Sequence, residues 1–224
     1  MQERPMPPSP PPGVPEAVRV QILVTEHWSL LATRNIAYGA VFSRANIFLT
    51  AVSAIVVALA LVAQLTKFGH AFYVFALLVL PFALLIGVAT YIRLVETRLE
   101  DFWLVSGMNR LRHAYLEIAP EIEPYFVTGH HDDQQGLYET YGPRTELRFY
   151  RLLAWTDMSV LVGVIDAALA GAIVGLLARA AGAGSDLSLF IGAVLTSVIV
   201  VLLVYATKKI VERGRGSLQP RFPR

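Results

Sequence analysis

Four apolar runs of about 20 residues dominate this sequence of 224 amino acids. They occupy residues 47–66, 71–91, 158–177 and 187–206, and each has the ~20 residues that an α-helix needs to cross a hydrocarbon layer of ~30 Å. Lipid offers the backbone no hydrogen-bonding partner, so a run that crosses a bilayer alone must be helical. The runs therefore predict an all-α fold, a bundle of four transmembrane helices.

The connections between the runs are short within each pair, which predicts two helical hairpins. Residues 67–70 join the first pair, residues 178–186 join the second, and the long segment 93–156 separates the pairs. The composition agrees with lipid as the solvent, because 55% of the residues are hydrophobic and 16% are charged. A soluble domain averages about 45–50% apolar and about 25% charged residues.

The basic residues are distributed unevenly about the runs. Of the 19 Lys and Arg, only Lys67 and Arg179 lie in the two short connections. The other 17 lie before the first run, in the central segment or after the fourth run. Because cytoplasmic loops carry the excess of Lys and Arg, we expect both termini and the central segment in the cytoplasm.

The polar segments divide the chain further. Residues 1–15 hold seven of the 13 prolines and predict a disordered tail. Residues 16–46 have apolar side chains at helical spacing and predict an amphipathic helix, either on the membrane surface or packed on cytosolic protein. A four-span domain over residues 16–206 and a basic cytosolic tail over residues 207–224 follow.

The central segment 93–156 predicts two cytosolic helical stalks and a loop. The second run continues as an amphipathic helix that must stop before Pro120. A helix restarts near Thr145 and enters the third run. The loop between them, residues 120–144, exceeds the ~12–15 residues usual for structureless connections, which marks it for inspection.

That loop contains His130, His131, Asp132 and Asp133 in succession. Imidazoles and carboxylates are ligands of zinc, manganese and iron, so a metal site is one hypothesis. Adjacent histidines on an extended chain point to opposite faces, however, and the spacing matches no known ligand motif. The alternative is a solvated polar loop that caps a helix or binds the stalks.

Asp166 is the only ionisable side chain near the middle of any run. A charge there costs ~2.5–3.5 kcal/mol on insertion scales, so such residues usually face a bundle interior or water. One hypothesis is a protonated carboxyl group bonded across helices to Ser53, Thr196 or Ser197. The other, equally weighted, is a role in the passage of ions or protons.

Small residues recur at every fourth position of the third run: Gly163, Ala167, Gly171 and Gly175. Such a stripe lets another helix approach closely. The partner helix belongs either to the same chain or to a second copy in a homo-oligomer.

Enzyme and nucleic-acid functions have little support in the sequence. There is no cysteine, which excludes disulfides, thiolate catalysis and Cys-ligated metals. No phosphate-binding loop, dinucleotide fingerprint or nucleophile elbow occurs, so we predict no catalytic residue. The net charge of +2 comes from bases beside the apolar runs, where anionic headgroups explain them, and nucleic acid is not an expected partner.

Four stretches carry a likeness to a known group: residues 27–34, 42–44, 56–64 and 127–133. Through them the chain, over roughly residues 20–205, resembles a group of uncharacterised multi-pass membrane proteins of actinobacterial type. The resemblance implies a bacterial inner-membrane setting. The group has no assigned activity, so no catalytic residue is transferred.

Three functional hypotheses follow. The first is a non-enzymatic scaffold or signalling module in the bilayer, whose cytosolic stalks meet a protein partner. The second is a small oligomeric channel or proton-coupled carrier that uses Asp166. The third is a membrane-bound metalloenzyme with its metal at His130 to Asp133.

Overall fold

A computed structural model describes residues 13–141, 157–216 and 219–224. Within these ranges every regular element is a helix. The helix expected to restart near Thr145 and most of the proline-rich segment 1–15 lie outside the described residues. The elements are α1 (Glu16–Thr66), α2 (His70–Ile118), η1 (Pro120–Tyr125), α3 (Gln134–Tyr141), α5 (Met158–Ala180) and α6 (Ser185–Gly216).

The four long helices α1, α2, α5 and α6 each contain one of the apolar runs, and each is long and apolar enough to cross a membrane. This confirms the all-helical class and the four long apolar helices. At 1.5 Å per residue the 51 residues of α1 extend about 75 Å, far more than a bilayer needs. Much of α1 and α2 therefore projects beyond the apolar runs. We call these projecting parts, residues 16–46 of α1 and 92–118 of α2, the stalk. Only the part from α2 corresponds to a stalk predicted from the sequence.

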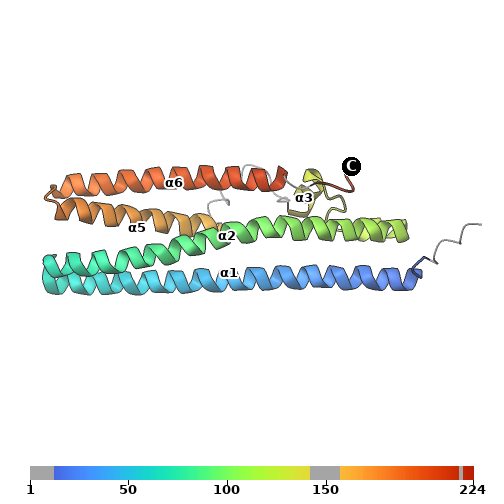
Figure 1. Cartoon of the computed structure of the whole chain (residues 1–224), viewed down its shortest axis with the longest axis horizontal. Helices are drawn as coiled ribbons and strands as arrows, with labels where there is room; N and C mark the ends of the chain where they lie inside the picture. Colours follow the sequence, from blue (N-terminus) through green and yellow to red (C-terminus); the bar gives the residue numbers. More distant parts are fainter. Residues whose placement is uncertain (1–12, 142–156, 217–218) are drawn as a thin grey trace, which may run out of the picture.

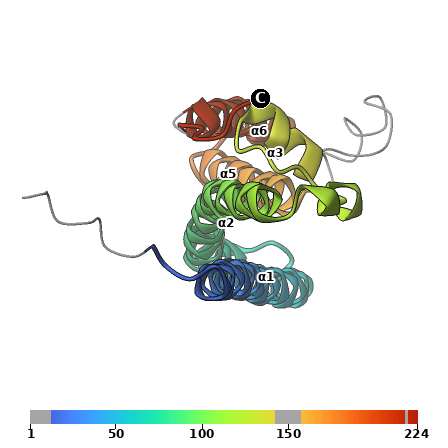
Figure 2. The ribbon, with the colours of Figure 1, turned by 90° about the vertical axis from the view of Figure 1, so that its right-hand side faces the viewer.

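The four long helices lie in a row. α1 packs along α2, α2 packs on α5, and α5 packs on α6. Figure 2, which looks along the helices, shows this order from one side of the molecule to the other. α2 and α5 have neighbours on two sides and supply most of the buried side chains, whereas α1 and α6 keep long apolar faces exposed.

Two tight turns join the helices at one end of the molecule, on the left in Figure 1. Between α1 and α2 the chain reverses through Lys67 and Phe68, which have positive φ angles of 48° and 57°. Between α5 and α6 it reverses at Gly182, with φ of 96°. The left-handed region disfavours a Cβ atom, so glycine suits position 182.

The segment 16–46 is part of α1 and runs straight on from the first apolar run beside α2 (Figure 1). A helix lying in the membrane surface is thus not confirmed. Arg34 and Tyr38 of α1 both bind the buried carboxylate of Asp101 in α2. The Arg34 Nε to Asp101 Oδ1 distance is 2.6 Å, and the Tyr38 hydroxyl donates to Asp101 Oδ2 at 2.9 Å. Burial, followed by the charge of Asp101, raises the pKa of Tyr38 to about 12.

The loop 120–144 has more structure than its sequence predicts. α2 ends at Ile118, as Pro120 requires, but η1 and α3 then occupy part of the loop. Leu137 of α3 is buried against Phe102 and Met108 of α2, which fixes α3 on the stalk. The predicted tail 207–224 also differs, because α6 continues to Gly216 and residues 219–224 return to the loop.

Candidate functional site

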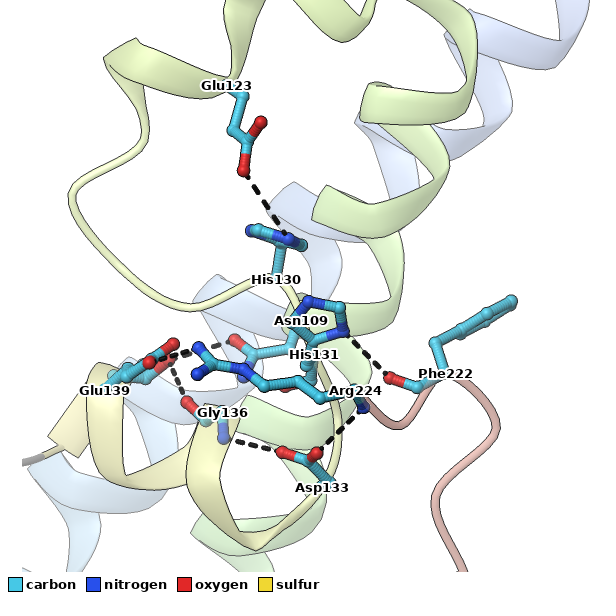
Figure 3. A network of polar contacts seen from close by, with 10 residues as sticks. Asn109, Glu123, His130, His131, Asp133, Gly136, Glu139, Phe222 and Arg224 are labelled. Carbon is cyan, nitrogen blue, oxygen red and sulfur yellow. Dashed lines mark hydrogen bonds and ion pairs between the residues drawn. The ribbon is translucent and has the colours of Figure 1, made fainter.

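A polar cluster joins α2, the loop 129–133, α3 and residues 219–224 (Figure 3). We call residues 109–113, 129–133 and 134–141 the stalk site, and residues 219–224 the docked segment. Asn109 of α2 is fully buried and organises the site. Its side-chain amide donates to the main-chain oxygen of His131 at 2.8 Å, and its Oδ1 accepts from Thr140 of α3 at 3.1 Å.

Asp132 is the innermost charged group of the stalk site, with a fully buried side chain. Its carboxylate accepts a bond of 2.6 Å from Arg110 Nε and bonds of 2.8 and 2.9 Å from the main-chain N–H groups of Arg221 and Phe222. Burial raises the pKa of this carboxyl group, but the two main-chain donors and Arg110 outweigh that effect and hold the pKa below its ordinary value. Asp132 thus carries a negative charge that pairs with Arg110 and is stabilised by two main-chain N–H groups of the docked segment.

Asp133 has a double role at the start of α3. It accepts from the main-chain N–H of Gly136 at 2.7 Å, which is the geometry of a helix N-cap. It also accepts from the main-chain N–H of Arg224 at 3.1 Å. The Gly136 bond, more than the Arg224 bond, lowers the pKa of Asp133. One carboxylate therefore holds both α3 and the end of the docked segment.

The histidines of the site contact one another and Phe222. The Phe222 ring stacks on His113 of α2, with ring centroids 4.4 Å apart, and Nδ1 of His131 lies 3.2 Å from the main-chain oxygen of Phe222. The rings of His130 and His131 are 4.3 Å apart. Burial, followed by the electrostatic effect of the neighbouring His131 ring, lowers the pKa of His130.

The structure does not gather the predicted metal ligands His130, His131, Asp132 and Asp133 into one set. No group of three or more His, Asp or Glu in the described residues is arranged to hold a metal ion. The carboxylates of Asp132 and Asp133 instead face main-chain donors. The loop contacts α2 through Asn109 and caps α3 through Asp133, as the alternative predicts, but Asp132 is buried and the loop is thus not simply solvated.

The sequence reasoning missed Asn109, Arg110 and the docked segment. Asn109 and Arg110 lie inside a long amphipathic helix, where polar residues are ordinarily solvated. The docked segment did carry a signal, because Pro220 and Pro223 interrupt an otherwise basic tail.

Asp166 is a residue of α5 whose side chain lies against α2, and its relative exposure is 4%. Neither carboxyl oxygen has a hydrogen-bond partner among the described residues. The predicted bonds to Ser53, Thr196 and Ser197 are wrong, because these hydroxyl groups donate to main-chain oxygens. The side chain instead occupies the space left by Gly87 of α2, where an added Cβ atom would lie 1.7 Å from Asp166 Oδ1.

The small-residue stripe of α5 faces mainly α6. A Cβ atom added at Gly171 would lie 2.5 Å from the main-chain oxygen of Gly192, and one added at Gly192 would lie 2.8 Å from that of Gly171. The two backbones thus approach closely at this pair. The main-chain oxygen of the buried Ala167 accepts a bond of 3.2 Å from Thr196.

The ends of the stripe have different neighbours. Gly175 faces the main chain of Ser188 in α6, whereas Gly163 lies against Tyr91 of α2 and Leu203 of α6. Ser188, Gly192 and Thr196 form a second stripe, at every fourth position of α6, which the sequence reasoning did not single out.

Comparisons with models of protein families, with curated proteins and with solved structures found no match to this chain. The contacts described above therefore carry the functional proposal.

Proposed function

We propose that the chain is a non-enzymatic scaffold or signalling module of the bacterial inner membrane, with a docking site for a protein partner at the end of its stalk. In this proposal α1–α2 and α5–α6 cross the bilayer as two hairpins. Both termini and the stalk are cytoplasmic, in agreement with the 17 bases on that side. The exposed apolar faces of α1 and α6 are covered by lipid.

The docked segment is the observation that carries the proposal. The stalk site already holds a short non-helical peptide, and it does so through main-chain groups of that peptide: three N–H groups bind Asp132 and Asp133. Contacts to main-chain groups depend little on the side chains of the bound peptide. A site built in this way can accept a peptide from another protein.

The stalk gives this site a suitable position. Residues 92–118 add about 40 Å of helix beyond the second apolar run, and α1 runs beside them. The carboxylate of Asp101 binds the stalk part of α1 to that of α2 through Arg34 and Tyr38. The site is therefore held on a paired-helix support, away from the proposed bilayer surface.

A binding experiment tests this function. The chain is truncated after Gly216, purified in mild detergent, and titrated into a fluorescent peptide of residues 217–224 while anisotropy is measured. We expect saturable binding. Asp132→Asn should weaken it at least tenfold, because the amide presents an N–H group to donors that need an acceptor.

The matched control is Asp186→Asn, at the start of α6 and remote from the stalk site, which should leave binding unchanged. If the truncated chain is helical and monodisperse but binds no peptide, the proposed function is wrong.

A second candidate is the channel or proton-coupled carrier. The buried carboxyl group of Asp166, which has no hydrogen-bond partner among the described residues, favours it. Its test is proton flux in reconstituted vesicles, which is described below.

A further inference from the structure

The main-chain donors of the docked segment are matched one by one to acceptors. After Gln219 the segment has only three main-chain N–H groups, those of Arg221, Phe222 and Arg224, and each donates to a carboxylate of the stalk site. The two remaining residues are Pro220 and Pro223, which have no N–H group. Every main-chain N–H group of residues 220–224 is thus bonded to a carboxylate of the stalk site.

The prolines also lower the cost of ordering the segment. Arg221 and Phe222 donate to the same carboxylate, that of Asp132, so the chain bends at these two residues. Pro220 and Pro223 flank the bend, and each proline ring restricts φ to about −65°. A peptide with such restricted ends loses less conformational entropy when it binds.

Carbonyl groups of the segment are bound as well. Arg110 donates to the main-chain oxygen of Gln219 at 3.0 Å, while its Nε binds Asp132. Nδ1 of His131 lies 3.2 Å from the main-chain oxygen of Phe222. The site therefore contacts main-chain groups on both sides of the bend.

Two side chains of the segment add selectivity. Phe222 stacks on His113, and the guanidinium group of Arg224 forms an ion pair with Glu139 of α3. The main-chain N–H of Arg221 is bonded, but its side chain is exposed. The aromatic residue and the arginine that follows the second proline are thus the side chains that the site contacts.

We infer that the stalk site selects peptides of the type proline, any residue, aromatic residue, proline, arginine, and that the docked segment is a built-in competitor for this site. A cytosolic partner binds by displacing residues 219–224 with a segment of the same chemistry. This inference rests on the proposed docking function and adds to it a ligand class and a form of autoinhibition.

A set of peptides tests the ligand class. Each carries one substitution in the sequence of residues 217–224 and is titrated against the chain truncated after Gly216, at physiological salt. Phe222→Ala should weaken binding up to about tenfold, since the aromatic contact is lost. Pro223→Ala should weaken it about two- to fivefold.

The arginines give a matched pair of peptides. Arg224→Gln should weaken binding about two- to fivefold, because its ion pair with Glu139 is partly exposed and modest. Arg221→Gln removes the same charge at an exposed residue that forms no ion pair with the described residues, and it should leave binding unchanged. A scrambled peptide of equal composition should not bind.

The full chain tests the competition. A tethered segment has an effective concentration in the millimolar range, so the full chain should bind the external peptide at least tenfold more weakly than the truncated chain. Phe222→Ala in the full chain should restore much of that binding, and Arg221→Gln in the full chain should not.

The outcomes separate the two proposals. If the truncated chain binds no peptide, the docking function itself fails. If it binds the native, Phe222→Ala and scrambled peptides equally, docking stands and the ligand class is wrong. If the full and truncated chains bind the peptide equally, the competition is refuted.

Discussion

Gly87→Ala should destabilise the protein, because Gly87 lies where three of the long helices meet and leaves no room for a Cβ atom. A Cβ atom at this position would lie 1.7 Å from Oδ1 and 2.6 Å from Cγ of Asp166, and 2.8 Å from a ring carbon of Phe48. Ordinary contact begins near 3.4 Å. Asp166 and Phe48 are both buried, so neither side chain can turn into solvent to make room.

Two opposing terms set the magnitude. Overpacking of a well-packed interior costs about 1–3 kcal/mol, whereas exchanging glycine for alanine inside a helix gains up to about 1 kcal/mol. Gly39→Ala isolates the second term, because Gly39 lies in α1 with no atom within 4 Å of an added Cβ. The difference in unfolding free energy between the two variants should therefore be the steric term, about 1–3 kcal/mol.

The assay is reversible denaturation in mild detergent, followed by far-ultraviolet circular dichroism, for Gly87→Ala, Asp166→Ala and the double variant. Removing the carboxyl group frees the space, so Gly87→Ala should cost at least 1 kcal/mol less in the Asp166→Ala background. Additive effects, within about 0.5 kcal/mol, would refute the packing of Asp166 against Gly87.

Three further predictions concern acidic residues. The pKa of Asp132 in the docked state is below its ordinary value of 3.8, so its contribution to docking is complete above that value and is lost as the pH falls through the lowered pKa. The protection factor of the Phe222 amide, which is its hydrogen-exchange rate relative to an unprotected amide at the same pH, should stay constant from neutral pH to about pH 4 and fall below it. Asp101→Ala removes the acceptor of three stalk hydrogen bonds, two from Arg34 and one from Tyr38, and should cost about 1.5–3 kcal/mol of unfolding free energy, measured by denaturation in detergent. Vesicles containing wild-type chain or Asp166→Asn should pass protons equally, at the background rate; flux that only the wild type supports would favour the carrier.

The four long apolar helices could be predicted because membrane-crossing length and apolar composition are properties of continuous sequence. The end of α2 could be predicted for a similar reason, since Pro120 acts on its immediate neighbours. The path of residues 16–46 could not. It depends on Arg34 meeting Asp101, 67 residues away in the chain, and an isolated amphipathic pattern does not say which surface its apolar face will meet.

The candidate site was located from its residue types, but its chemistry was not. The residue types of His130 to Asp133 predict metal ligands. In the structure the carboxylates of Asp132 and Asp133 instead bind main-chain N–H groups from residues about 90 positions later. A carboxylate is a good acceptor for either partner, so residue type alone does not discriminate between them. The lack of an N–H group at Pro220 and Pro223 could not be interpreted from the sequence. It can be interpreted only when the structure shows that the other three main-chain N–H groups of the segment bind carboxylates.

The contacts of the docked segment also suggest why it can be displaced. The ion pair between its Arg224 and Glu139 of α3 is partly exposed and therefore weak. Its partner Asp132 is also bound by Arg110, and we expect this ion pair to remain when the segment leaves, so that the buried charge keeps a counter-ion. Opening the site thus costs main-chain hydrogen bonds that a partner peptide re-forms. An occupant that stabilises the site moderately and leaves no unpaired charge behind is suited to exchange.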